Sequence, residues 1–141
     1  MKIAIINGPN LNLLGTREVD IYGSQKFDAF YKSLQQQFPA VEFSYFQSNI
    51  EGELINEIQR VGFAVDGMVF NPGGYTHTSV AIGDAIAAVT SPLIEVHISN
   101  IFGREEFRKL SHVSAKAKGV ISGLGLAGYE LAVEWFLKQH L

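Results

Sequence analysis

Five short runs of apolar residues recur along the chain, and a polar or glycine-rich stretch follows each of them. Most of these runs do not alternate between apolar and polar positions, which is typical of strands buried on both faces of a parallel sheet. We therefore predict strands at Lys2 to Asn7, Val41 to Phe46, Gly67 to Asn71, Leu93 to Ile98 and Gly119 to Ser122.

The segments between these runs place apolar residues at helical spacing. They predict helices at Ser24 to Phe38, Glu51 to Val61, Thr78 to Val89 and Leu126 to Gln139, with a shorter one at Arg104 to Leu110. Strands that alternate with helices indicate an α/β fold, in which helices cover both faces of a parallel sheet and the crossovers are right-handed. For five strands we predict a doubly wound sheet in the order 2-1-3-4-5.

The length of 141 residues, 47% of them hydrophobic, suits one globular domain spanning residues 1–141. A chain of this size buries roughly 68–70% of the surface that its unfolded form exposes. The net charge is -3, with 11 Lys and Arg against 14 Asp and Glu, so the chain offers no basic stripe to nucleic acid or anionic lipid. We expect neither a nucleic acid nor a membrane as its partner.

Cysteine is absent from the sequence, which excludes disulfides, thiolate metal sites and cysteine nucleophiles. No apolar run approaches the roughly 20 residues that span a bilayer, and the first run leads directly into Asn7-Gly8-Pro9 without the features of a signal peptide. We therefore expect a cytoplasmic protein whose reactive groups are oxygen or imidazole.

Polar residues and glycines follow every predicted strand. In doubly wound sheets, ligands bind beyond the carboxyl ends of the strands, and glycines there let backbone N–H groups approach a ligand. This edge suits a small polar or anionic ligand. Its segments are Asn7-Gly8-Pro9-Asn10, Gln47-Ser48-Asn49, Asn71-Pro72-Gly73-Gly74, His97-Ile98-Ser99-Asn100 and Gly123-Leu124-Gly125.

The connection from Gly8 to Gly23 is much longer than the usual connection of about 2–6 residues and shows no secondary-structure pattern of its own. We interpret it as a lid with Gly15 and Gly23 as hinges, and Ser24 as a cap of the following helix. Tyr22 in this lid is either an anchor of the loop or a base. A phenol ordinarily loses its proton near pH ~10, and a nearby arginine, here Arg17, favours the phenolate.

Alternation along a strand places Glu95 and His97 on the same face. A carboxylate beside an imidazole fixes its tautomer and supports its protonated form, as a general acid needs, although a purely structural pair has the same pattern. The position at a strand end favours function. The backbone N–H groups of Ile98 and Ser99, with Asn71 facing them, are candidates for a carboxylate-binding nest.

Metal and nucleotide sites are less favoured. His77, Glu95 and His97 are conceivable metal ligands, but they lack HExxH-type spacing, and we expect no metal. The glycines after Asn71 form neither a dinucleotide fingerprint nor a P-loop, so we expect no cofactor. Arg104 and Arg108, four residues apart, either remain solvated or return to the cleft and contact substrate oxygens.

Five separated motifs bring these residues together with their neighbours: Ile6-Asn7-Gly8-Pro9-Asn10-Leu11, Arg17-Glu18 with Tyr22-Gly23, Gln47-Ser48-Asn49 with Glu51-Gly52-Glu53-Leu54, Tyr75-Thr76-His77-Thr78-Ser79-Val80-Ala81, and Ile94-Glu95-Val96-His97-Ile98-Ser99-Asn100 with Arg104-Glu105-Glu106-Phe107-Arg108. With them the chain closely resembles the type II 3-dehydroquinate dehydratases, from the first strand to the last helix. The resemblance implies a flavodoxin-like domain. It also implies a cofactor-free anti elimination of water from 3-dehydroquinate through an enolate, giving 3-dehydroshikimate for aromatic amino acid biosynthesis (the shikimate pathway) or during quinate catabolism.

The resemblance implies a role for each matched residue in the chemical steps. Tyr22 would remove the C2 proton, with Arg17 stabilising its phenolate. Asn10, through an ordered water, would help to hold negative charge on the C3 oxygen. His97, oriented by Glu95, would protonate the leaving C1 hydroxyl.

Substrate binding is implied in the same way. Asn71 and the backbone of Ile98 and Ser99 would hold the substrate carboxylate, while His77 and Arg108 would bind ring hydroxyls.

The remaining implications concern the lid and the assembly. Arg104 resembles a residue that orders the lid and the site. Asp84 would reach the site of a neighbouring subunit, in a homo-oligomer of trimers stacked into a dodecamer. The sequence departs from the family at Val19, where proline is frequent, and at Gly83, where a larger residue is expected. The second departure puts the intersubunit contact in doubt.

A non-enzymatic alternative is a flavodoxin-like binding or signalling module. A phosphoreceiver would need an acidic residue where this chain has Asn71, and a flavin-binding module would need a hydroxyl-rich loop after the first strand. Both features are missing from the sequence. Metal-dependent hydrolysis by His77, Glu95 and His97 is the alternative enzyme class.

Overall fold

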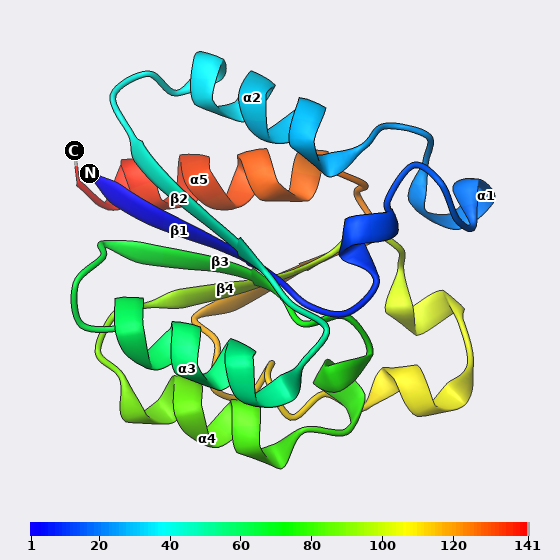
Figure 1. Cartoon of the computed structure of the whole chain (residues 1–141). Helices are drawn as coiled ribbons and strands as arrows, with labels where there is room; N and C mark the ends of the chain where they lie inside the picture. The colour runs from blue at the N-terminus through cyan, green and yellow to red at the C-terminus, as the bar shows by residue number, and fades with distance from the viewer. Residues whose placement is uncertain (141) are drawn as a thin grey trace.

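A computed structural model describes residues 1–140 and contains one parallel five-stranded sheet in the order β2-β1-β3-β4-β5. The predicted fold class and strand order are therefore confirmed (Figure 1). Leu141, the last residue of the predicted domain, lies outside the described residues. Within residues 1–140 no helix is both long enough and apolar enough to cross a membrane.

The strands lie close to their predicted positions. Three of them have the predicted bounds, and β2 begins one residue later than predicted because Val41 takes part in the preceding turn, where its N–H donates to the Phe38 carbonyl. The bounds are β1 Lys2–Asn7, β2 Glu42–Gln47, β3 Gly67–Asn71, β4 Leu93–His97 and β5 Gly119–Ser122. In the register of the sheet Asn7 pairs with Gln47 on one side and with Asn71 on the other, so three polar strand ends lie side by side.

The long helices cover both faces of the sheet (Figure 1). Helices α2 (Phe27–Gln37) and α5 (Ala127–Gln139) cover one face, and α3 (Glu51–Val61) and α4 (Val80–Ala88) cover the other. Each face has its own buried cluster. Phe30, Leu34, Val133 and Phe136 belong to the first cluster, and Leu54 and Ile58 of α3 with Ile82 and Ile86 of α4 belong to the second. The three central strands β1, β3 and β4 are thus buried on both faces, as their lack of alternation predicted, whereas the edge strands β2 and β5 are partly exposed.

Short helical turns occupy the connections at the carboxyl edge of the sheet. They are η1 (Leu11–Leu13), α1 (Val19–Tyr22), η2 (Gly73–His77), η3 (Ile101–Gly103) and η4 (Glu106–Lys109). One prediction was wrong here, because the lid connection does contain elements of its own. The short helix predicted at Arg104 to Leu110 is present only as the turn η4, and Arg104 lies in the break between η3 and η4.

The predicted cap of α2 was also wrong. The helix begins at Phe27 and its N-cap residue is Lys26, which has an extended backbone and no side-chain cap hydrogen bond. Ser24 lies instead at the neck of the loop, where its carbonyl oxygen is so close to Gly15 that a Cβ added there would lie 2.7 Å from it. The chain at the first predicted hinge, Gly15, therefore meets the chain just beyond the second, Gly23, as the ends of compact surface loops do.

Candidate active site

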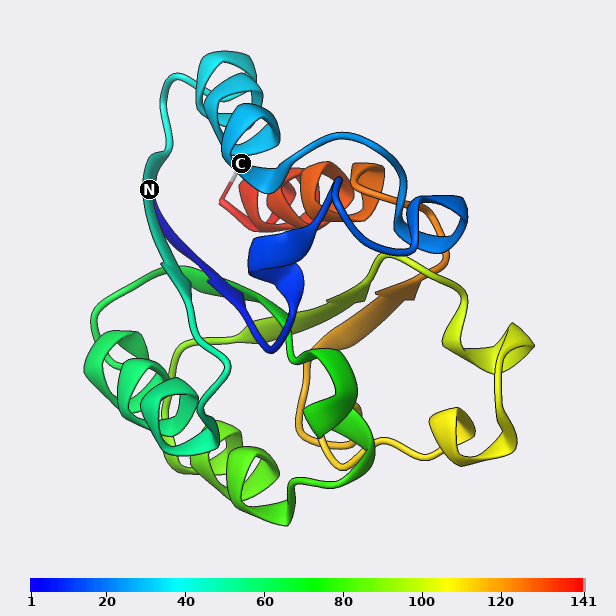
Figure 2. The ribbon, with the colours of Figure 1, turned by 45° about the vertical axis from the view of Figure 1, so that its right-hand side comes forward.

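A cavity of about 130 Å³ opens beyond the carboxyl ends of β1, β3 and β4. Figure 2 shows the segments that surround it: the lid in blue, η2 in green, and η3 and η4 in yellow. We call this cavity the cleft. Ten residues singled out in the sequence line it, namely Asn10, Arg17, Tyr22, Asn71, His77, His97, Ile98, Ser99, Arg104 and Arg108.

Two of the predicted site residues do not line the cleft. Glu95 is fully buried behind His97. Asp84 is exposed on α4, away from the cleft lining, so a role in catalysis within its own chain is not supported. The predicted reach of Asp84 into a neighbouring subunit stays a prediction.

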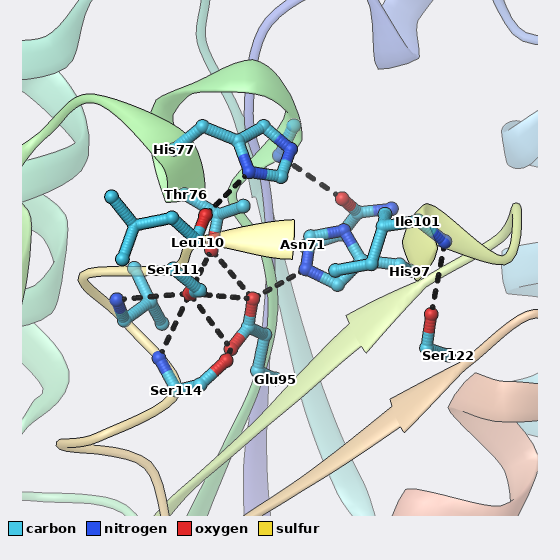
Figure 3. A network of polar contacts seen from close by, with 12 residues as sticks. Asn71, Thr76, His77, Glu95, His97, Ile101, Leu110, Ser111, Ser114 and Ser122 are labelled. Atoms are coloured by element: carbon cyan, nitrogen blue, oxygen red, sulfur yellow. Dashed lines mark hydrogen bonds and ion pairs between the residues drawn. The ribbon is translucent and has the colours of Figure 1, made fainter. Parts of the chain in front are cut away.

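Glu95 and His97 form a buried pair at the end of β4 (Figure 3). His97 Nε2 hydrogen-bonds Glu95 Oε2, and both side chains are on the same face of the strand, as alternation predicted. Burial alone would raise the pKa of the Glu95 carboxyl, but the contact with His97 and the hydroxyls of Ser114 and Thr76 outweigh it and lower the pKa below its ordinary value. The carboxylate is therefore held in its ionised form.

Three hydroxyls surround this carboxylate, and we call them the hydroxyl cradle (Figure 3). Thr76 Oγ1 donates to Glu95 Oε2 at 2.6 Å, and Ser114 Oγ donates to Oε1 at 2.5 Å. Ser111 Oγ lies 3.4 Å from Oε2 and 2.6 Å from Thr76 Oγ1. The sequence analysis missed this cradle, because Ser111 and Ser114 lie in an irregular segment whose pattern gives no hint of where it folds back.

The segment that carries the cradle packs closely against α4. The N–H of His112 donates to the Thr76 carbonyl at 2.7 Å, and a Cβ added at Gly83 would lie 2.6 Å from the His112 carbonyl oxygen. A side chain at position 83 therefore cannot be accommodated without a backbone shift. The packing therefore gives a physical reason for glycine at this position.

The two histidines of the cleft have parallel rings, with centroids 6.5 Å apart and planes 19° apart. His77 Nδ1 lies 2.7 Å from the Leu110 carbonyl oxygen, which can only accept, so Nδ1 carries the proton. Burial lowers the pKa of His77 below its ordinary value, although the hydrogen bond to Leu110 acts in the opposite direction. Neutral His77 therefore presents an unprotonated Nε2, which accepts a hydrogen bond.

For His97 the assignment is reversed, because Nε2 is the nitrogen that contacts Glu95. Within residues 1–140, His97 Nδ1 makes no hydrogen bond, whereas every fully buried side-chain nitrogen or oxygen makes at least one. The Nδ1 atom is therefore accessible, and the cleft is the space that His97 lines. Proton exchange between His97 and a bound molecule would occur at Nδ1.

Tyr22 of the lid lies between two arginines. The Arg17 guanidinium carbon is 5.2 Å from the centre of the tyrosine ring, and that of Arg104 is 5.6 Å away. Only Arg104 contacts the hydroxyl, to which its Nη1 donates at 2.9 Å, while Arg17 pairs with Glu18 at 2.5 Å. Sequence proximity pointed to Arg17 as the partner of the phenol, but the direct partner comes from 82 residues away along the chain.

The lid conformation also gives a physical reason for Val19, where the resemblance leads us to expect proline. Val19 is the first residue of α1, a position at which proline is favoured in helices. Glu18 before it has a left-handed backbone with φ 45° and ψ 49°. Because a following proline disfavours α-type conformations, the lid conformation in this chain suits Val19 better than proline.

Backbone and amide donors are present at the floor of the cleft. Within residues 1–140, no hydrogen bond uses the N–H of Ile98 or of Ser99, so both amides are available to a ligand. Asn71 is nearly fully buried and lines the same cavity. Arg104 Nη1 donates to Ser99 Oγ at 3.1 Å, which places a positive charge beside these amides. This region suits an anionic group.

The other polar residues of the cleft have local partners. Arg108 pairs with Glu105 at 2.6 Å through Nε, which leaves its terminal nitrogens for a ligand. Asn10 has a left-handed backbone with φ 70°, and its N–H donates to Asn49 Oδ1 at 3.0 Å. This contact fixes the loop after β1 and leaves the Asn10 side chain at the cleft.

A metal site is not supported by the side chains that the structure describes. In residues 1–140 no group of three or more His, Asp or Glu side chains is arranged to hold a metal ion. Both oxygens of Glu95 already accept hydrogen bonds from the hydroxyl cradle. The donors that remain in the cleft are amides, imidazoles and guanidinium groups, which suit an organic anion.

Comparison with known proteins gives consistent matches over nearly the whole chain. The family model "Dehydroquinase class II" matches residues 1–137. The 3-dehydroquinate dehydratase of Fusobacterium nucleatum is 50% identical over 99% of this chain and 99% of that protein. That of Campylobacter jejuni is 52% identical over 94% of this chain and 85% of that protein. The crystal structure of type II dehydroquinase from Butyrivibrio crossotus superposes with a TM-score of 0.93 at 46% identity, covering 96% of this chain and 97% of that one.

Proposed function

The chain belongs to the class II dehydroquinases, so its reaction is the dehydration of 3-dehydroquinate, and we propose that Tyr22 and His97 are the base and the acid of that reaction. The observation that carries this proposal is that one cleft contains a phenol bound to a guanidinium and an imidazole bound to a buried carboxylate. The phenolate of Tyr22 removes the proton from C2, and His97 donates a proton to the C1 hydroxyl, which leaves as water.

The base requires a Tyr22 phenolate in the closed lid. Its support is the pair of guanidinium groups beside the ring, because a nearby positive charge favours the ionised form of a phenol. Arg104 donates directly to the oxygen that must carry the negative charge. We therefore assign the main stabilising role to Arg104, with Arg17 as the second cation.

The acid requires a protonated His97 held in one orientation. The Glu95 carboxylate supports the protonated ring through Nε2, and the accessible Nδ1 delivers the proton to the leaving hydroxyl. The hydroxyl cradle keeps the carboxylate ionised and in place. A carboxylate that orients an imidazole in this way is a recurrent arrangement in general acid–base catalysis.

The substrate is anionic, and the floor of the cleft is suited to its carboxylate. Asn71 and the N–H groups of Ile98 and Ser99 bind this carboxylate, while the Nε2 of neutral His77 accepts a hydrogen bond from a ring hydroxyl. Arg108 binds a second ring hydroxyl.

The enolate forms at C3 once the C2 proton has left. Asn10, through an ordered water, stabilises the negative charge that develops on the C3 oxygen. Loss of one such donor typically costs about 2.7–4 kcal/mol in transition-state stabilisation.

The assembly and the cellular setting are proposed from the family resemblance. We expect trimers stacked into a dodecamer, with Asp84 of one subunit near the cleft of another, and a cytoplasmic enzyme of aromatic biosynthesis or quinate breakdown. Asp84 is exposed on α4, which is compatible with an intersubunit contact. Sedimentation of the purified protein tests the assembly.

The chemical roles are tested by following the conjugated product by ultraviolet absorbance. Tyr22→Phe and His97→Ala should each lower kcat by at least about 10²-fold, the usual range for a lost acid or base. Tyr75→Phe is the matched control, because its hydroxyl donates to the Asn49 carbonyl outside the cleft lining, and it should turn over normally. Near-normal turnover of Tyr22→Phe would remove the tyrosine from its role, and loss of activity with a chelator would favour metal-dependent chemistry.

A further inference from the structure

Directly beneath the cleft, the hydroxyl of Tyr129 lies between two buried asparagines. Tyr129 is on α5 and has no exposed surface, and Asn7 and Asn71 end the neighbouring strands β1 and β3. The Tyr129 oxygen is 2.8 Å from Asn7 Oδ1 and 3.1 Å from Asn71 Nδ2. Asn71 lines the cleft, whereas Tyr129 and Asn7 do not.

The direction of every hydrogen bond in this group follows from one backbone amide. The N–H of Gly73 can only donate, and it lies 3.1 Å from the Asn71 side chain, so the atom it contacts must be the carbonyl oxygen Oδ1. The other side-chain atom of Asn71 is then the NH2 group, which donates one hydrogen to Tyr129. Tyr129 accepts this hydrogen bond and must direct its own proton to Asn7 Oδ1.

Asn7 continues the series of hydrogen bonds that runs from Gly73 through Asn71 and Tyr129. Because its Oδ1 accepts from Tyr129, its Nδ2 donates, and the nearest acceptor is the Tyr45 hydroxyl at 3.4 Å. Burial raises the pKa of the Tyr129 hydroxyl well above its ordinary value, so this proton remains in place at any working pH. The order of donors is therefore the same throughout the pH range in which the enzyme operates.

We propose that Tyr129 is a positioning residue that fixes the Asn71 amide so that its second N–H hydrogen points into the cleft. An amide nitrogen carries two hydrogens, and within residues 1–140 only one of them has a partner, which is Tyr129. This inference rests on the proposed role of Asn71 as a ligand of the substrate carboxylate. A reversed amide would present its oxygen to that carboxylate and repel it.

Packing alone does not account for the hydroxyl. The Tyr129 ring contacts Phe27 and Phe30, with centroids 5.2 Å and 5.7 Å away, and a phenylalanine would make the same contacts. A hydroxyl at a fully buried position loses its hydration, and only its hydrogen bonds to the two asparagines compensate for this loss.

The test is the variant Tyr129→Phe, with KM and kcat measured separately. Without the hydroxyl the Asn71 amide keeps only its hydrogen bond from the Gly73 N–H and loses the acceptor of its Nδ2 group. KM should therefore rise about 10-fold while kcat changes less than about 2-fold, as for a loss of uniform binding. Tyr45→Phe is the matched control, since it removes the hydroxyl of a partly buried tyrosine that contacts Asn7 rather than Asn71, and its KM should stay near that of the wild type.

A second comparison separates positioning from structural damage. Once Asn71 is replaced by alanine, the Tyr129 hydroxyl has no amide to orient, so Tyr129→Phe/N71A should have the same KM as N71A. An additive rise in KM in the double variant, or an unchanged KM in Tyr129→Phe, would overturn the inference. If Tyr129→Phe does not fold, Asn7→Ala releases the Tyr129 proton from its acceptor and should also raise KM.

Ligand binding allows the same comparison to be made without measuring catalysis. Dissociation constants of the product 3-dehydroshikimate, measured by calorimetry, should rise by the same factor in Tyr129→Phe as KM does. This readout does not depend on the roles of Tyr22 and His97. A failure of the proposed acid and base therefore leaves the test of Tyr129 intact, and unchanged product affinity would refute the positioning role alone.

Discussion

Deleting one hydroxyl of the cradle tests whether the cradle holds a charged group. In Ser114→Ala, Glu95 Oε1 loses its 2.5 Å hydrogen bond and keeps only the Ser111 hydroxyl at 3.5 Å. A hydrogen bond to a charged group contributes about 1.5–3 kcal/mol, so the free energy of unfolding near pH 7 should fall by that amount. For a domain of this size the melting temperature should fall by roughly 5–10 °C.

The dependence of this loss on pH identifies its cause. The pKa of Glu95 is lowered in the folded protein, so its ionisation stabilises the fold above the ordinary carboxyl pKa of about 4.3, and this stability is lost as the pH falls through the folded pKa. Removing a donor raises the folded pKa. Both proteins should therefore begin to lose this stability near the same unfolded-state pKa, but the loss in the variant should be smaller and should end at a higher pH. The two melting temperatures should converge once Glu95 is protonated in both.

Thermal unfolding monitored by circular dichroism between about pH 3 and pH 8 measures both effects. Ser91→Ala is the matched control, because the Ser91 hydroxyl is also partly buried but donates to a neutral acceptor, the Val65 carbonyl, at 2.7 Å. It should cost about 0.5–1.5 kcal/mol at every pH. A loss in Ser114→Ala that is equally independent of pH would refute the argument, since it would show that Ser114 does not act through the carboxylate.

Two further substitutions can each be compared with a similar substitution elsewhere in the chain for which we expect a different result. Gly83→Ala should destabilise the fold by about 1–3 kcal/mol, because its Cβ would meet the His112 carbonyl oxygen at 2.6 Å. Gly52→Ala in α3, with open space around it, should instead stabilise the fold by up to about 1 kcal/mol. Chemical denaturation measures both changes, and a stabilised Gly83→Ala would contradict the close packing. Arg104→Met should lower kcat/KM by about 10- to 100-fold through the lost hydrogen bond to Tyr22, and Arg17→Met should lower it less. Steady-state assays compare the two variants. A larger loss in Arg17→Met would return the main role to Arg17.

The fold could be predicted from the sequence because its determinants are local and redundant. Runs such as Lys2 to Asn7 and Gly67 to Asn71 are apolar throughout, and the intervening segments have helical spacing, so strand bounds and order followed from general rules. The errors fell in the connections, where contacts distant in sequence decide the local structure. Ser24 is a good capping residue in isolation, but the closure of the loop at Gly15 holds it away from the helix end.

The site could be predicted only in part, for a different reason. Residues at strand ends, such as Asn71 and His97, are brought together by the sheet itself, so topology sufficed to group them. The contact between Tyr22 and Arg104 joins two connections that lie outside the sheet, and the contact between Ser114 and Glu95 joins a loop to a strand. No periodic pattern determines how such loops pack, and their partners can be identified only from the folded chain.

The hydrogen bond from Arg104 to Tyr22 joins the lid to the rest of the protein. In the proposed mechanism, one interaction would therefore both hold the lid in place and support the oxygen that removes the proton. The two functions cannot be tuned independently: a stronger latch would retain the product for longer, and a weaker one would deprive the phenol of its cation. Natural variation at either position should therefore trade the speed of product release against the speed of proton removal, and a faster enzyme would need a second contact to hold the lid.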